Sequence, residues 1–435
     1  MHRKFNFSKS KPKPEDYLPK NLPEDPDYYY HIELITDLSN DQLTSFEHKL
    51  ESHPFYEALK NNFIFNKEKK ALIHILHRVD KKEIEEFSEK QKRYYPICSK
   101  EEIYRLSDPK SSEDMLLLLR AEEVAENPTL QRICFRAMEE KGERWNFTKY
   151  FDSPLFSKYK SYLNHDTKQK CWNIPAGFFL MAEANGSCWP TEFGNFITVS
   201  YHLKQFFYYM NLWEHGERLN VPEIDCQRAL LLAIRTIMQF ESPDFELDPR
   251  GLLPKRIHRM INNMTNFQLT FIIGHEFAHH YLGHLEGKCI TREEMLHAVS
   301  VPGERRFYST IQEQEFDADY YAIASTTLDG QMKELLLAEA CAALFYFDIY
   351  ECIHAFESPF PNSHPPALER IQVLREKFPE LRMFNNSLDF KINRNRKLKE
   401  SLNDQLSWLY ADLERDGSVY LPSYKRKIMN DRLDF

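Results

Sequence analysis

The sequence predicts a mainly helical fold of the α+β class with one small antiparallel sheet. Only 12 of the 435 residues are glycine, which argues against a sheet-rich fold with many tight turns. Most of the chain repeats apolar residues three and four positions apart, the spacing of amphipathic helices. The stretch 172–203 instead shows two strand-like segments around a turn-forming Asn-Gly-Ser.

The chain divides into four regions by composition. Residues 1–30 are rich in proline and charge, which predicts an extended leader. Residues 31–165 show a polar helical pattern and are expected to form a helical N-terminal domain. Residues 166–385 contain the strand pair and the long helices, and we expect them to form the main domain. Residues 386–435 are expected to form a helical C-terminal tail.

Charge and hydropathy narrow the possible partners and location. The formal net charge is −9 with no long basic block, so nucleic acid is not an expected partner. No apolar run is long enough for a membrane span; the closest, residues 335–350, is interrupted by Glu339 and Asp348 and reads as a buried helix. The eight cysteines form no CxxC pair and no export signal precedes them, so we expect reduced thiols in a cytoplasmic protein.

A candidate metal-binding motif occurs at residues 275–279. His275, Glu276 and His279 spell HExxH. Residues four apart on a helix share one face, so the two imidazoles can converge on one Zn²⁺ at about 2.0–2.1 Å. Glu276 lies beside them, where its carboxylate can reach a water in the same site. The motif therefore predicts a hydrolytic zinc centre, and the alternative is a buried helix that is rich in histidine.

Two nearby histidines, His280 and His284, are not expected to bind the metal. Each lies five residues after one of the motif histidines, so each is expected to point well off the ligand face. We therefore interpret both as packing groups or as outer partners of the ligands. Gly283 is suited to the C-terminal end of the helix.

A third metal ligand is expected downstream. The metzincin pattern fails, because Leu282 and Leu285 stand where it needs glycine and histidine. Glu315 and Asp319 lie four apart on a predicted helix whose other residues are mostly apolar. Glu315 can complete the coordination, and Asp319 can orient a ligand histidine. Two histidines and a carboxylate can also hold iron, so the choice of metal stays open.

A further histidine, His364, precedes two prolines and a predicted helix. From this loop it could stabilise an oxyanion, although lone loop histidines are also frequent without such a role. Arg370, in the first turns of the helix, could pair with acidic groups of the site.

These segments together resemble the HtpX and CAAX-prenyl-protease family of gluzincin metallopeptidases. That family shows HExxH, then Glu-x-x-x-Asp, then Ser-His-Pro-Pro followed by arginine, as at 275–279, 315–319 and 363–370 here. The resemblance implies a zincin-like domain in which Glu315 is the third zinc ligand, Asp319 its outer partner and His364 a transition-state group. It also implies a substrate-binding edge strand, placed on Phe196, Ile197, Thr198, Val199 and Ser200.

The function implied by the resemblance is hydrolysis of a protein or peptide substrate. The family's membrane spans and export signals are missing, and the long N-terminal region resembles regulated bacterial enzymes such as the Lit-like phage-exclusion metallopeptidases. A regulatory partner acting through that region is therefore expected. The alternatives are a metal-binding scaffold or adaptor that does not cleave, and a latent toxin or phage-defence protease.

Overall fold

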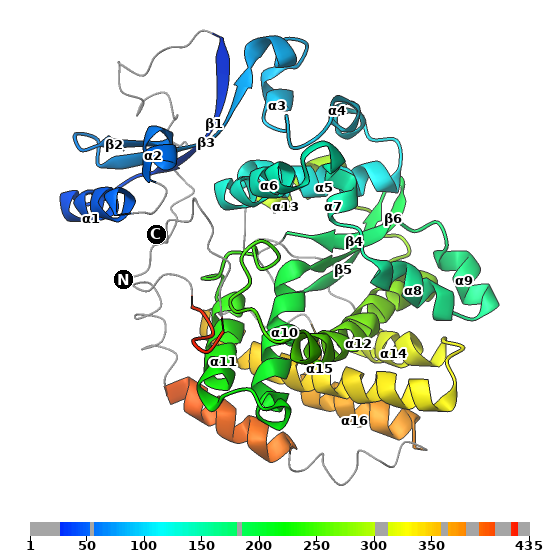
Figure 1. Ribbon diagram of the computed structural model, residues 1–435. Helices are drawn as coiled ribbons and strands as arrows, with labels where there is room; N and C mark the ends of the chain where they lie inside the picture. The colour runs from blue at the N-terminus through cyan, green and yellow to red at the C-terminus, as the bar shows by residue number, and fades with distance from the viewer. Residues whose placement is uncertain are drawn as a thin grey trace. The chain divides into compact units, whose positions relative to one another are not determined.

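The chain is seen in a computed structural model that describes residues 27–52, 56–180, 185–300, 312–357, 364–379, 391–404 and 419–424. The predicted leader 1–30 falls almost wholly outside these residues. Two compact units are present (Figure 1). The first unit consists of the described residues up to Ile103 together with Asn127–Trp145. The second unit consists of Tyr104–Glu126 together with the described residues from Asn146 to Tyr424.

The first unit is built on an antiparallel sheet that the helical pattern of residues 31–165 did not predict. Its strands, in the order β1-β3-β2, are Tyr28–Ile35, Ala71–Asp80 and Phe63–Asn66. Apolar residues in these strands also recur at helical spacing, and their pairing is non-local, so periodicity alone could not separate the two states. The helical elements of this unit are α1 Asn40–Glu51, α2 Tyr56–Leu59, η2 Lys60–Asn62, η3 Lys81–Ile84, α3 Glu89–Lys92, α6 Pro128–Lys141 and η4 Gly142–Arg144, while α4 Lys100–Ser107 leads into the second unit.

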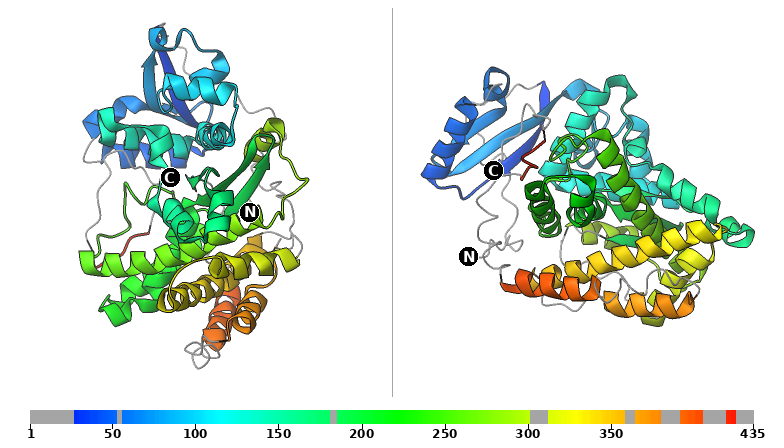
Figure 2. Two further views of the ribbon diagram at one scale, coloured as in Figure 1. Left: turned by 90° about the vertical axis from the view of Figure 1, so that its right-hand side faces the viewer. Right: turned by 60° about the horizontal axis from the view of Figure 1, so that its bottom comes forward.

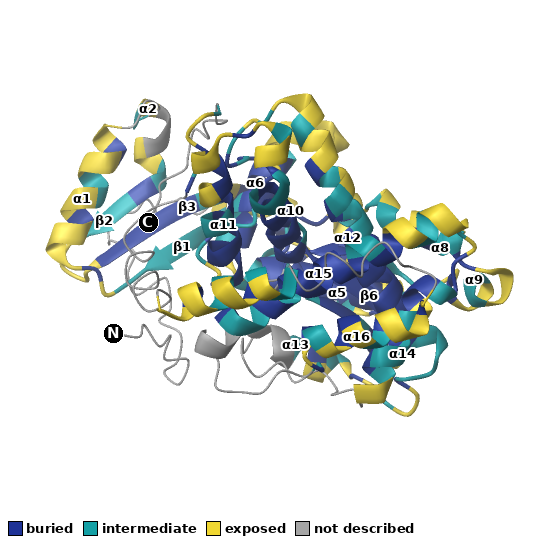
Figure 3. Ribbon diagram, turned by 90° about the horizontal axis from the view of Figure 1, so that it is seen from below, coloured by how far each residue is buried: buried dark blue, intermediate teal, exposed yellow. Residues whose placement is uncertain are grey.

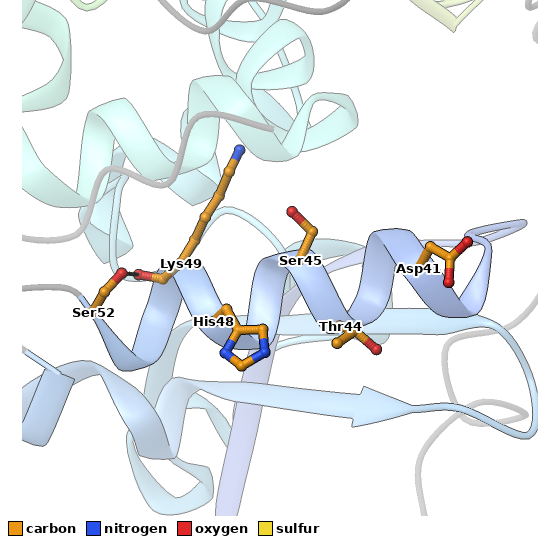
Figure 4. A pocket seen from close by; sticks show the side chains of 6 residues that line it. All are labelled: Asp41, Thr44, Ser45, His48, Lys49 and Ser52. Carbon is orange, nitrogen blue, oxygen red and sulfur yellow. Dashed lines mark hydrogen bonds between the residues drawn. The ribbon is translucent and has the colours of Figure 1, made fainter.

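A shallow depression of about 530 Å³ runs along the exposed face of α1 (Figure 4). It contains none of the residues that the sequence motifs single out. It is lined by Asp41, Thr44, Ser45, His48, Lys49 and Ser52.

The second unit contains a three-stranded mixed sheet beside its long helices. The strands are β4 Ala176–Phe179, β5 Gly186–Thr191 and β6 Gly194–Ser200, in the order β4-β6-β5. β6 is parallel to β4 and antiparallel to β5. The tight turn lies between β5 and β6, where Gly194 takes a φ of 105°. The Asn-Gly-Ser segment that was expected to form the turn begins β5 instead.

Long helices form the core of the second unit (Figures 1 and 2). α12 (Lys255–Tyr281) contacts α10 (Tyr201–His215), α14 (Gln312–Ala324) and α15 (Gly330–Glu357), and α10 also packs on α11 (Glu223–Ile237). α15 and α5 are among the most buried elements (Figure 3). The other helical elements are α5 Ser112–Glu126, α7 Phe147–Tyr150, α8 Pro154–Tyr162, α9 His165–Cys171, η5 Glu217–Leu219, α13 Arg292–Ser300, α16 Ala367–Lys377 and a helix at residues 391–404.

The expected fold class is confirmed: the protein is mainly helical with small sheets, and thus α+β. The apolar run 335–350 belongs to α15, whose Leu336, Leu344 and Ile349 are fully buried in the core. Among the described residues, no helix is both long and apolar enough to span a membrane.

A buried cluster of charges ties the chain after α11 to the segment 419–424. The Arg250 guanidinium is fully buried and pairs with Glu241 at 3.0 Å and with Asp244 at 2.7 Å. Arg235 also pairs with Glu241, at 2.6 Å. The main chain of Leu421 then donates a hydrogen bond to the Arg250 carbonyl. Because these charges are out of water, each depends on its partner.

We predict that Arg250→Met lowers the free energy of unfolding by about 3–5 kcal/mol, because it removes the cation that the buried carboxylates of Glu241, Asp244 and Asp248 share. Thermal and urea unfolding followed by circular dichroism measure the loss. Lys110→Met is the matched control, since Lys110 pairs with Asp108 where both side chains are more than three-quarters exposed. Equal stability of the two variants would contradict a structural role for the cluster.

Candidate metal centre

The HExxH motif lies in the last two turns of α12, which is buried there by neighbouring helices and the sheet. His275, Glu276 and His279 are only 3 %, 7 % and 5 % exposed. α12 contacts both β5 and α14 in this region. The helix ends at Tyr281, and Gly283 follows with a φ of 76°, the left-handed conformation that glycine favours after a helix.

Glu315, on α14, meets both motif histidines. The Nε2 atoms of His275 and His279 lie 3.1 Å apart. They lie 3.3 Å and 3.4 Å from the two carboxylate oxygens of Glu315. Ligand atoms on a tetrahedral zinc at about 2.0–2.1 Å are separated by roughly 3.3 Å. The two imidazole nitrogens and the Glu315 carboxylate therefore lie about as far apart as ligand groups on one metal ion, with a different carboxylate oxygen facing each histidine.

Asp319 lies one turn further along α14 and orients His275. Its carboxylate oxygen lies 2.9 Å from His275 Nδ1. Arg370, at the start of α16, donates to both carboxylate oxygens of Asp319 at 2.7 Å. Burial would raise the pKa of Asp319, but the Arg370 cation and the hydrogen bonds outweigh it and lower that pKa. An ionised Asp319 fixes the His275 tautomer with its proton on Nδ1 and leaves Nε2 for a metal.

The charges of the centre favour a cation at His275 Nε2. Burial disfavours a charged imidazole, yet Asp319 and Glu315 raise the pKa of His275 to about 10. Burial also opposes ionisation of Glu315, but the charges and hydrogen bonds of His364 and His275 lower its pKa far below the usual value. The negative charges of Glu315 and Asp319 therefore favour a cation beside His275.

His364 contacts the same carboxylate from the loop before α16. Its Nδ1 lies 2.6 Å from Glu315 Oε2, and its side chain is about one-third exposed. The ligand atoms of His275, Glu315 and His364 all lie within 4.8 Å of one another. His364 can therefore serve as a metal ligand or as a hydrogen-bond donor to a bound molecule. His275 and Glu315 would bind the metal in either case.

Glu276 faces the sheet at the first residue of β5. A Cβ atom on Gly186 would lie 3.0 Å from Glu276 Oε1 and 3.0 Å from the Ile272 side chain. Glycine at this position thus allows the strand to approach the motif. Burial raises the pKa of Glu276 to about 7. A carboxyl group with this pKa can both accept and return a proton near neutral pH.

The expected substrate-binding edge, residues 196–200, is wrong. β6 is the central strand of its sheet, paired with β4 on one side and β5 on the other. Its main-chain groups are used in the two ladders, and no edge remains for an added strand. The five side chains are also fully buried: Phe196, Ile197, Thr198, Val199 and Ser200 are each 0 % exposed.

Two residues near the centre carry signals that the motifs did not include. Tyr159, on α8, packs where a side chain on Gly274 would stand, 2.7 Å from the missing Cβ, and its hydroxyl donates to the Ala322 carbonyl of α14. A glycine in a helix interior is the sequence signal for such a close approach. His284 lies beside His279, with 3.0 Å between their Nδ1 atoms. His280 instead contacts Asn195 and the Lys170 carbonyl.

We predict that Gly274→Ala lowers the stability of the protein by about 1–3 kcal/mol, because the new methyl group would collide with the Tyr159 ring. The intrinsic preference of helices for alanine would act in the opposite direction. Gly330→Ala is the control, since a Cβ at that helix start meets nothing within 4 Å. Melting temperatures of the two variants check this, and a stabilised Gly274→Ala variant would contradict the packing.

Residues 238–384 match the family model described as Peptidase U49. No curated protein and no solved structure matches the chain. The matched segment contains α12, α14 and α16, and with them His275, Glu276, His279, Glu315 and Arg370. This stretch of the chain is therefore similar to a peptidase family, and the similarity indicates proteolytic function.

Proposed function

We propose that this protein is a zinc-dependent endopeptidase of the zincin type, with His275, His279 and Glu315 as the metal ligands. The observation that carries the proposal is the close approach of their ligand groups: the two Nε2 atoms lie 3.1 Å apart, and each lies 3.3–3.4 Å from one of the two carboxylate oxygens of Glu315. Asp319 holds His275 by a hydrogen bond to Nδ1 and is itself held by Arg370, as outer partners do in histidine metal sites. The similarity of residues 238–384 to a peptidase family also supports hydrolysis of peptide bonds.

Each side chain has a distinct part in the proposed reaction. A zinc ion bound there supplies a Lewis acid that lowers the pKa of water towards about 7. Glu276 takes the proton from the attacking water and returns it to the leaving amine, consistent with its raised pKa. His364, partly exposed beside Glu315, donates a hydrogen bond to the carbonyl oxygen as it becomes negative.

The outer edge of β5 is the place we propose for an extended substrate. The N–H of Ile197 in β6 donates to the carbonyl of Pro175, the residue before β4. Its partner in the antiparallel ladder is Cys188, whose N–H and C=O must therefore point away from β6. Two residues further along, the Pro190 carbonyl already accepts a hydrogen bond from Ile290. At Gly186, which lies next to Glu276, the N–H donates to Asn185 Oδ1 and the carbonyl accepts from the Ser187 hydroxyl. The outward N–H and C=O of Cys188 are therefore the groups we propose for pairing with a substrate.

The other edge of this sheet does not suit a substrate. The Phe151 carbonyl accepts the Phe178 N–H of β4. The buried Arg120 guanidinium donates to the Phe178 carbonyl at 3.0 Å. Gly177 leaves room for that guanidinium, since a Cβ there would lie 2.1 Å from Arg120 Nη2. With these groups occupied, β5 is the favoured edge for strand addition.

Glu276→Gln is predicted to keep zinc but to lose about 10²–10⁴-fold in turnover, because the amide cannot accept the proton from water. Unfolded casein and a cell lysate are suitable substrates, assayed with and without a chelator. Glu313→Gln, an exposed change on α14, is the control. If the Glu276→Gln variant cleaves substrate at the wild-type rate, Glu276 is not the base. If the wild-type protein cleaves neither substrate, a scaffold that binds without cleaving is favoured.

Glu315→Ala is predicted to lower the zinc content of the purified protein, because two imidazoles alone leave the tetrahedral set incomplete. Elemental analysis of protein purified without added metal measures zinc and iron together. Zinc in the wild type and its loss in the variant would support the ligand assignment. Iron in place of zinc would correct the choice of metal, and equal zinc in both proteins would exclude Glu315 as a ligand.

A further inference from the structure

The chain after α12 turns back and places a second imidazole against the ligand His279. Gly283, with a φ of 76°, reverses the chain direction. The N–H of His284 then donates to the His279 carbonyl at 3.1 Å, which closes the turn. The ring of His284 meets the ring of His279 edge to face, with centroids 5.1 Å apart. Main chain and side chain thus join the same two residues.

The hydrogen bond between the two rings has a direction if His279 binds a metal. His279 uses Nε2 towards Glu315 and His275. A neutral imidazole that binds a metal through Nε2 carries its proton on Nδ1. The Nδ1–H of His279 must then donate to Nδ1 of His284, 3.0 Å away. His284 accepts this bond with its own proton on Nε2.

The two ligand histidines therefore have unlike outer partners. His275 is held by the carboxylate of Asp319, which Arg370 holds in turn. His279 is held by a neutral ring on a turn, and His284 is only partly buried. A carboxylate makes the stronger, charge-assisted bond. The hold on His279 is thus the weaker of the two, and it depends on a residue outside the helix.

We propose that His284 is a positioning residue for the metal ligand His279, fixing its tautomer and ring orientation and thereby the affinity of the centre for zinc. The inference rests on the proposed zinc function. His280 does not share this role, because its ring contacts Asn195 and the Lys170 carbonyl instead. Removing the partner of a ligand histidine commonly lowers metal affinity by about 10–100-fold. For a neutral partner we expect the lower end, about 10-fold.

The test measures zinc affinity by competition with a chromophoric chelator, and the rate of zinc loss to excess chelator, in the full chain. His284→Ala should bind zinc about 10-fold more weakly and release it faster. His284→Asn should restore most of the affinity, since its side-chain oxygen can accept the same hydrogen bond. His284→Leu fills a similar space without an acceptor and should behave as His284→Ala does.

The control is His258→Ala, on the same helix, where the ring accepts or donates a hydrogen bond with the Tyr208 hydroxyl away from the motif. It should leave zinc affinity unchanged. If His284→Ala and His284→Leu bind zinc as the wild type does, the inference is overturned. If His284→Ala does not fold, the comparison of His284→Leu with His284→Asn decides. Failure of the wild type to bind zinc would instead refute the proposed function.

Discussion

The burial of the carboxylates of α14 against the histidines of α12 is the constraint on which the second unit depends. Glu315 and Asp319 are each 1 % exposed, and His275 is 3 % exposed. Leaving such groups without partners would cost several kcal/mol each. The cost is avoided only if α12, α14 and α16 keep the register that brings Arg370 to Asp319 and both histidines to Glu315. The packing of these helices and the geometry of the candidate centre therefore depend on the same contacts.

Two glycines let neighbouring elements reach the motif helix on different sides. Gly274 leaves room for the Tyr159 ring, so α8 packs closely against α12. The Tyr159 hydroxyl also donates a hydrogen bond to α14. Gly186 admits the backbone of β5 next to Glu276. Each glycine stands where a side chain would push a partner away from the motif. The close packing that buries Glu276 and raises its pKa also places β5 beside its carboxyl group.

Helical periodicity predicts which residues of each motif share one face, while side-chain chemistry and the resemblance to a metallopeptidase family predict that the two motifs meet; neither predicts what surrounds them. The spacings of HExxH and Glu-x-x-x-Asp define one face of a helix, and the structure brings His275, His279 and Glu315 together as expected. Sheet order depends on non-local pairing, so β6 was mistaken for an edge. For His284 the sequence left packing and contact with a ligand as alternatives, and its Nδ1 lies 3.0 Å from His279 Nδ1 because the chain turns at Gly283. The strands β1 to β3 were missed for the same lack of non-local information.

The division of the chain limits how the long N-terminal region could regulate the centre. Tyr104–Glu126 and the described residues from 146 to 424 belong to the unit that contains the motif. Within them, Arg120 occupies the edge of β4 and Tyr159 packs against the motif helix. Deleting residues 1–165 would remove both, so a change in activity would report damage to the centre as readily as release from inhibition. Because Asn127–Trp145, which contains α6 and η4, also belongs to the first unit, a test of that unit as a regulatory module must remove this segment as well as the N-terminus.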